Sequence, residues 1–408
     1  MGTRRHLGRC AGLMLALAGC RDGPQDAPAA APVPERAEAA RGETGTGSPG
    51  TTPASTAPAA AAPARAELAA AIEILSAPLR SAAGRGDNPW ALAHGVLAFG
   101  PEHRTLDGTL AIDRLVSFVE EGERDTHTRL RFPREHDGRP VEPHPHIIVR
   151  AMLEAGVPLQ RPLGDGAPAI TPKRLLADLR AELSSPDTDA AWHEVAWGMD
   201  ALTLGGDAVA PVEGLRQAAL ARLEAEQQVL LDSSGPAASA LGPDTPLGAA
   251  RRGKRAIFAH ACGGLHLAQA VFRSVARDGT PAEKARGVTQ LRALQRRFQI
   301  ERTLYASVLR QRPDAALLIA RQELKFFGHL AETLAVAEPL CETPEARALW
   351  TGLRAETLRA LVDTVRRLQS LNAYGSLAAL EARDHQTYLD LIGDGCHALR
   401  ALRLAADG

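Results

Sequence analysis

Apolar side chains recur at helical spacing along most of the chain after residue 66. Leu, Ala and Arg, which favour helix, dominate there, whereas runs rich in Val, Ile, Thr and Tyr, which would mark strands, are nearly absent. Apolar residues at helical spacing predict amphipathic helices in six segments. These are residues 68–79, 110–119, 175–183, 212–231, 282–309 and 346–371. The pattern predicts an all-α domain over residues 66–408.

A second kind of predicted helix alternates with the amphipathic ones. It is short, rich in small residues and carries a histidine, as in residues 90–98. Six such histidines lie 47 to 69 residues apart, so each step leaves room for one amphipathic helix. They are His94, His146, His193, His260, His329 and His397. The chain is therefore predicted to fold as about six helical hairpins.

Six hairpins of alternating type resemble an (α/α) toroid, in which inner helices ring a central cavity and outer helices cover them. The small residues would let the histidine-bearing helices approach closely around the ring. Histidines at the same stage of successive inner helices would then point toward one mouth of the cavity. The alternative is an open helical solenoid, for which more even repeat lengths and no clustering of histidine in one helix type are expected.

Two segments interrupt the helical pattern. In residues 122–143, alternating side chains flank Asp137-Gly138, a pair that favours a tight turn and so predicts a small β-hairpin. Residues 232–253 are rich in Gly, Pro, Ser and Ala. A long loop in a compact domain is either a lid or binding loop, or a tolerated surface insertion.

The first twenty residues have the layout of a secretory signal. A basic start precedes a Leu- and Ala-rich run over residues 10–18, which is too short to span a bilayer. The run ends in Leu-Ala-Gly-Cys at residues 17–20, which resembles the lipobox of bacterial lipoproteins. That resemblance implies removal of residues 1–19 as a lipoprotein signal peptide and attachment of a diacylglyceryl group to Cys20. An ordinary cleaved signal with a chance cysteine is the alternative.

Residues 20–65 consist mostly of Ala, Pro, Gly, Ser and Thr with scattered charges. Such a segment cannot bury enough apolar surface to offset the entropy lost on ordering. It is predicted to be a disordered linker between the lipidated Cys20 and the domain at 66–408. Together these features predict an exported protein that is anchored through Cys20 to a bacterial membrane, either inner or outer.

The charge of the chain argues against a nucleic-acid partner. The net charge is −1 over 408 residues, and the only dense basic run lies at residues 251–255. That run is typical of a solvated loop and helix start rather than of a phosphate site. The sequence also contains no nucleophile elbow, phosphate loop or dinucleotide motif.

The densest group of potential metal ligands is His260-Ala-Cys262-Gly-Gly-Leu-His266. Cys262 and His266 are four residues apart and would share one face of a helix, unless the paired glycines form the start of that helix. His329 lies one predicted hairpin later. Cys thiolate and His imidazole suit zinc, and catalytic zinc sites combine three protein ligands with one open position.

This spacing resembles the zinc site of protein prenyltransferase β chains, a toroid family in which an Asp-x-Cys pair is joined by a His one hairpin later. His260 takes the Asp position here, so the resemblance implies a zinc site on His260, Cys262 and His329. His266 joins the predicted ligands because of its four-residue spacing from Cys262. The lanthionine cyclases are a second toroid family, with zinc on a Cys and a Cys-His pair. Cys396-His397 resembles that pair, but the 134 residues between Cys262 and Cys396 exceed the order of that family.

A third option needs no metal. Many toroid enzymes cleave polysaccharides with Glu or Asp pairs, or with His and Tyr, as acid and base. The candidates are His193, Glu194, His329, Glu332 and Tyr388, and the predicted catalytic residues among them are His193, His329 and Glu332. Glu332 follows His329 by three positions, so both side chains can face the cavity.

The sequence therefore predicts a membrane-anchored envelope lipoprotein with a cavity lined by His and Cys. We expect a zinc-dependent or acid/base enzyme that acts on a carbohydrate-like or peptide-like ligand. The alternative is a non-catalytic binding or scaffold lipoprotein, in which the histidines only join the inner helices. Convergence of Cys262, His266 and His329 in a solvent-connected pocket would favour the enzyme, whereas histidines bonded to backbone and shut from solvent would favour the scaffold.

Overall fold

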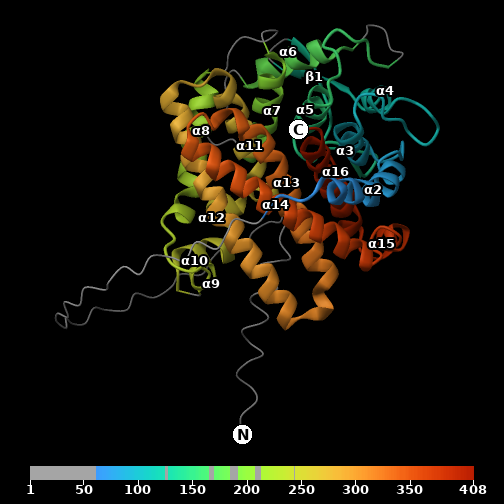
Figure 1. The fold of residues 1–408 in the computed structure, drawn as a ribbon. Coiled ribbons are helices and arrows are strands. Elements are labelled where there is room, and N and C mark those ends of the chain that lie inside the picture. Colours follow the sequence, from blue (N-terminus) through green and yellow to red (C-terminus); the bar gives the residue numbers. More distant parts are fainter. Residues whose placement is uncertain (1–60, 125–126, 165–169, 184–191, 207–212, 243) are drawn as a thin grey trace, which may run out of the picture.

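The computed structural model describes residues 61–124, 127–164, 170–183, 192–206, 213–242 and 244–408 (Figure 1). The predicted signal peptide, Cys20 and nearly all of the predicted linker lie outside these described residues. Within the described part, none of the helices has the length and apolarity that crossing a membrane requires.

Helices make up most of the described chain, which confirms the predicted all-α class. Six of them correspond to the predicted histidine-bearing type and are called the cycle helices below. They are α3 (Pro89–Phe99), α5 (Ile147–Glu154), α7 (Trp192–Leu204), α11 (Leu265–Asp278), α13 (Ala316–Ala337) and α16 (His385–Asp407). A second set alternates with them along the chain. It comprises α2 (Arg65–Ala82), α4 (Ala111–Val116), α6 (Pro172–Leu183), α8 (Glu213–Leu231), α12 (Pro281–Gln311) and α14 (Pro344–Ser370).

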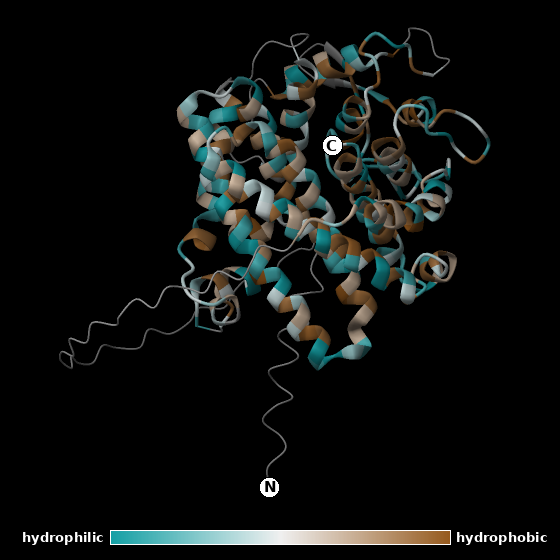
Figure 2. Cartoon of the chain, viewed as in Figure 1, coloured by the Kyte–Doolittle hydropathy of each residue, from teal (hydrophilic) through white to brown (hydrophobic). Residues whose placement is uncertain are grey.

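The cycle helices contact one another in chain order, from α3 to α5, α7, α11, α13 and α16. α16 also packs against α3, so these contacts close on themselves (Figure 1). The second set lies against them: α6 contacts α5 and α7, α8 contacts α7 and α11, and α12 contacts α11 and α13. Figure 2 shows that the long helices carry both hydrophobic and hydrophilic residues, as helices with one buried and one solvated face do.

Local signals determine where the helices begin. Thr280 accepts a hydrogen bond from the backbone N–H of Glu283, and the Glu283 carboxylate accepts one from the backbone of Thr280, which forms a capping box at the start of α12. Asp384 caps α16 by accepting from the backbone N–H of Thr387.

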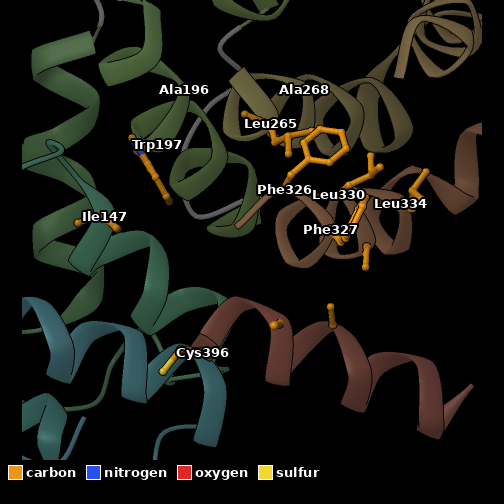
Figure 3. Close-up of a cluster of buried hydrophobic side chains, with 14 of the residues drawn as sticks. Ile147, Ala196, Trp197, Leu265, Ala268, Phe326, Phe327, Leu330, Leu334 and Cys396 are labelled. Atoms are coloured by element: carbon orange, nitrogen blue, oxygen red, sulfur yellow. The ribbon is translucent and has the colours of Figure 1, made fainter. Parts of the chain in front are cut away.

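Small residues allow the cycle helices to approach closely, as the sequence predicts. A Cβ added at Gly328 of α13 would lie 3.2 Å from the backbone of Ala398 on α16, and one at Gly393 would lie 2.4 Å from the Trp90 ring. Apolar side chains fill the adjoining space, where Phe326 and Leu330 lie near Leu265 in a buried cluster (Figure 3). α13 and α16 are therefore held close enough for their polar side chains to meet.

The two interruptions of the helical pattern differ from each other in outcome. The predicted hairpin is confirmed: β1 (Glu120–Arg124) pairs with β2 (His127–Arg131), and β3 (Glu135–His136) pairs with β4 (Arg139–Pro140). Asp137 and Gly138, the predicted turn pair, connect β3 and β4 and both have positive φ. The predicted loop at 232–253 was wrong in part, because it contains the short helices α9 (Ala237–Ala240) and α10 (Pro246–Arg252).

Candidate metal centre

A cavity of about 130 Å³, partly open to solvent, lies among the cycle helices. Every cycle helix, or the segment just before it, contributes to its wall. The polar and aromatic residues that line it are Trp90, His94, His144, Trp197, Cys262, His266, Lys325, His329, Gln386, Asp390, Asp394 and His397. The cavity thus collects chemically capable side chains from segments that lie far apart in the sequence.

Three imidazoles contact one another in this cavity. The ring centroid of His329 lies 4.0 Å from that of His397 and 4.6 Å from that of His266, and the centroids of His266 and His397 are 5.4 Å apart. Trp197 covers His266 with a centroid separation of 3.7 Å. Burial lowers the pKa of His266 well below its ordinary value and that of His397 to about 3, so both rings are neutral at pH 7. Neutral imidazole is the form that binds metal ions.

Cys262, His266 and His329 form a group that can hold a metal ion. One potential ligand atom from each of the three lies within 4.8 Å of the others. His266 and His329 are buried, and Cys262 is half-buried. The structure therefore brings together three of the four residues that the sequence nominates for zinc.

The backbone that carries Cys262 has an unusual conformation. Cys262, Gly263 and Gly264 have φ values of 47°, 61° and 74°, so three successive residues are left-handed immediately before α11. The two glycines therefore form the start of the helix rather than a turn within it. A left-handed cysteine is uncommon and is strained, and such strain concentrates at functional sites. This turn directs the Cys262 thiol toward His266. A regular helix through Cys262 would give the thiol another direction.

A carboxylate orients His329. Nε2–H of His329 donates to Oδ1 of Asp394 over 3.3 Å, which leaves Nδ1 as the lone-pair nitrogen. That Nδ1 is buried and makes no hydrogen bond to any described residue. Burial opposes ionisation of Asp394, but Lys325 and His329 together hold its pKa below the ordinary value. A carboxylate on one nitrogen and an open lone pair on the other is the usual arrangement of a metal-binding histidine.

His397 is supported in the same manner by Glu332. Nδ1–H of His397 donates to Oε2 of Glu332 over 2.7 Å, and Oε1 of Glu332 accepts from Arg400 over 2.7 Å. Glu332 is completely buried and does not belong to the cavity wall. Ligand atoms of Glu332, His329 and His397 also lie within 4.8 Å of one another, so Glu332 is close to His329, although it does not line the cavity.

The remaining candidates lie elsewhere. Nε2 of His260 is 3.3 Å from Glu226 of α8, so His260 is not part of the metal-ligand group. Glu194 pairs with Arg134 over 2.5 Å. The phenol oxygen of Tyr388 accepts from Arg85. The side chain of His193 falls outside the described residues.

Two further candidates are separated from the cavity by packing. Cys396 is buried in the hydrophobic cluster of Figure 3, and burial raises the pKa of its thiol. His146 lines a separate cavity of about 430 Å³ with Glu142 and Glu182, while its neighbour His144 reaches the central cavity. Because Cys396 lies in the hydrophobic cluster while His397 lines the cavity, the two side chains of the Cys396-His397 pair do not face a common metal site.

Sequence reasoning missed Lys325, Asp390 and Asp394. A signal for them exists, because Asp390, Asp394 and His397 follow one another at steps of four and three, as on one face of a helix. Lys325 precedes His329 by four positions in the same way. A search for charged residues three or four positions from each candidate histidine would therefore have identified them.

The comparisons with known proteins add no relative. No protein-family model, curated protein or solved structure matches this chain.

Proposed function

We propose that this protein is a lipid-anchored envelope enzyme that binds one zinc ion through Cys262, His266 and His329 in the central cavity of an (α/α) toroid. The closed cycle of contacts from α3 to α16 and back supports the toroid over the open solenoid. The lipobox-like residues before Cys20 support the anchor.

One observation carries the zinc site. Ligand atoms of a thiol and two imidazoles lie within 4.8 Å of one another on the wall of a cavity. Independently, Nδ1 of His329 is buried without a hydrogen bond to a described residue. A buried polar atom without a partner calls for an explanation such as an ion. Three ligands from Cys and His leave the fourth tetrahedral position of zinc for water or substrate.

The chemistry follows from that open position. Zinc there would polarise a substrate carbonyl and lower the pKa of a bound water so that it attacks at neutral pH. Asp394 would orient His329, and Glu332 would hold His397 with its Nε2 toward the cavity. The ligand class remains carbohydrate-like or peptide-like, as expected for the envelope.

Metal analysis tests the zinc site. The full-length chain, isolated and dialysed against metal-free buffer, should retain about one zinc per chain, because a Cys-His-His set binds zinc tightly. Cys262→Ser and His329→Ala should each lower this content at least tenfold. Cys341→Ser, which changes a buried thiol outside the cavity, should keep it. A wild-type chain without zinc, or a Cys262→Ser chain with a full complement, would contradict the site.

The scaffold alternative also has a specific observation in its favour. Nδ1–H of His94 donates to the backbone carbonyl of Trp90 in the same helix over 2.7 Å, so this cavity histidine is already satisfied by backbone and needs no catalytic role. The same zinc measurement separates the two functions. A scaffold predicts a folded chain that binds no metal.

The anchor has its own test. Cys20→Ser should abolish lipid attachment and release the domain from membranes, because the lipobox cysteine is the only lipid acceptor that the resemblance implies. Metabolic labelling with a fatty acid, followed by fractionation, measures both effects. Cys10→Ser alters the other cysteine of the same leader and should leave labelling intact. Unchanged labelling and membrane association of Cys20→Ser would refute the anchor.

A further inference from the structure

The turn that carries Cys262 is held from outside the metal-ligand group. Cys262, Gly263 and Gly264 all have positive φ, and a strained backbone of this kind persists only where surrounding contacts fix it. One such contact comes from Arg297 of α12, whose Nη1 donates to the backbone carbonyl of Gly263. A Cβ on Gly263 would overlap Nη2 of Arg297, so the absence of a side chain at this position is what lets the guanidinium approach.

Arg297 is itself fixed on its other sides. It is 4% exposed, and its guanidinium carbon lies 5.2 Å from the ring centroid of Phe258 and 5.1 Å from that of Phe326. Nε of Arg297 is 3.7 Å from Oε1 of Glu301, one turn further along α12, and Arg251 donates to Oε2 of the same carboxylate over 2.9 Å. Burial of a charge is costly unless the charge is paired, so the pairing with Glu301 restricts the guanidinium to this position.

The contacts of Arg297 reach both sides of the proposed zinc site. Gly263 follows Cys262 directly, and Phe326 precedes His329 by three positions on α13, so those two side chains are neighbours on that helix. Arg297 is not among the described residues that line the central cavity, and a protonated guanidinium has no acceptor lone pair to offer a metal ion. Its place is therefore behind the ligands, where it fixes the segment of Cys262 relative to the helix of His329.

We propose that Arg297 is a positioning residue of the zinc site, which keeps the Cys262 thiol within reach of the metal ion by fixing the carbonyl of Gly263. This inference rests on the proposed function. Without the bond from Arg297 the left-handed turn is free to relax, and the thiol moves away from the two imidazoles. His266 and His329 lie within the regular helices α11 and α13, so they keep their places. The loss should therefore be confined to the thiol ligand.

Zinc affinity measures this loss, when the zinc-loaded full-length chain is titrated with a chelator of known affinity. Arg297→Met removes the donor and keeps a long side chain, and it should weaken zinc binding by about 10- to 100-fold, as loss of an outer-shell contact usually does. Arg403→Met is the matched control and should bind zinc as the wild type does. Arg403 also donates to a backbone carbonyl, that of Ala98 over 2.6 Å, and also lies over a phenylalanine ring, that of Phe99, but it is not part of the cavity wall.

Cobalt(II) in place of zinc separates positioning of the thiol from a general loss of structure. A thiolate bound to cobalt gives a near-ultraviolet charge-transfer band that imidazole ligands lack. In Arg297→Met this band should fall to about half or less per bound cobalt. His266→Ala should lose affinity but keep the band, whereas Cys262→Ser should lose the band. Arg297→Lys retains a cation and a donor, so its affinity should lie between those of Arg297→Met and the wild type.

The outcomes separate this inference from the proposed function. A wild-type chain that binds neither metal rejects the proposed function itself. If the wild type binds zinc, an Arg297→Met affinity within twofold of that of Arg403→Met, or an undiminished thiolate band, rejects the positioning role alone. If Arg297→Met does not fold, Arg297→Lys is compared with Arg403→Lys. A severalfold weaker zinc affinity of Arg297→Lys then supports the role, and equal affinities reject it.

Discussion

Replacing Glu332 with alanine should destabilise the fold by about 3–5 kcal/mol, the usual cost of removing one partner from a buried ion pair. Glu332 is completely buried on α13 and bonds to His397 and Arg400 of α16, over 2.7 Å in each case. Although burial opposes its ionisation, these partners hold the pKa of Glu332 well below the ordinary value, so it is an anion at neutral pH. Its removal leaves the Arg400 cation with less compensation in a site shielded from water.

Urea unfolding at pH 7 measures this loss. Glu356→Ala is the matched control, because Glu356 also pairs with an arginine, Arg302 at 3.8 Å, but on the surface of the domain. A surface pair of that kind contributes about 0–1 kcal/mol. Glu332→Gln keeps an acceptor for His397 and removes only the charge, so its loss should fall between the two alanine variants. A Glu332→Ala loss no larger than that of Glu356→Ala would refute the structural role.

The case of Glu332 also shows how far the sequence can place a side chain. The spacing to His329 correctly puts both residues on neighbouring positions of one helix, α13. Which atoms Glu332 meets depends on α16, whose contact residue His397 lies 65 positions later. Helical periodicity determines the direction of a side chain relative to its own helix but contains no information about the neighbouring helix. Predicting what the Glu332 side chain contacts would therefore have required knowing how α13 packs against α16, which the close approach of Gly328 to Ala398 sets.

The helices were predictable for a related reason. Apolar residues at helical spacing and caps such as Thr280 and Asp384 act within a few positions of the chain. The histidines that face the cavity were harder to select. His144 rather than His146 reaches it, because His146 is left-handed at φ 71° just before α5 and turns into the other cavity.

In the segment before α11, too, backbone turns decide which residues reach the candidate metal site. The sequence indicated Gly263 and Gly264 as a potential helix start, but a cysteine carries no sequence signal for the positive φ that Cys262 adopts. Its thiol joins His266 and His329, while His260, two residues earlier, turns toward Glu226. Ligand type and approximate spacing were thus available from the sequence, whereas the choice among neighbouring residues depended on backbone turns.

Glu142 should make the protein less stable as the pH rises from about 4.5 to about 8. It lies just before α5, is 5% exposed, and accepts a hydrogen bond from the backbone N–H of Ile148 over 2.9 Å. Burial raises its pKa from an ordinary value of 4.5 to about 8. Because the folded state binds the proton more tightly than the unfolded state, the contribution of Glu142 is complete below pH 4.5 and is lost as the pH approaches 8. A shift of this size corresponds to stability on the order of 5 kcal/mol.

Urea unfolding of wild type and Glu142→Gln at pH 5 and pH 8.5 isolates this contribution. Glutamine keeps the acceptor for Ile148 but cannot ionise, so the unfolding free energy of the variant should fall less between the two pH values, by several kcal/mol. Glu135→Gln, at an exposed position of β3, should change with pH as the wild type does. Parallel pH dependences for wild type and Glu142→Gln would mean that Glu142 is already ionised in the folded state. Since Glu142 and His146 line the same cavity of about 430 Å³, water or Arg134 would then have to stabilise that charge.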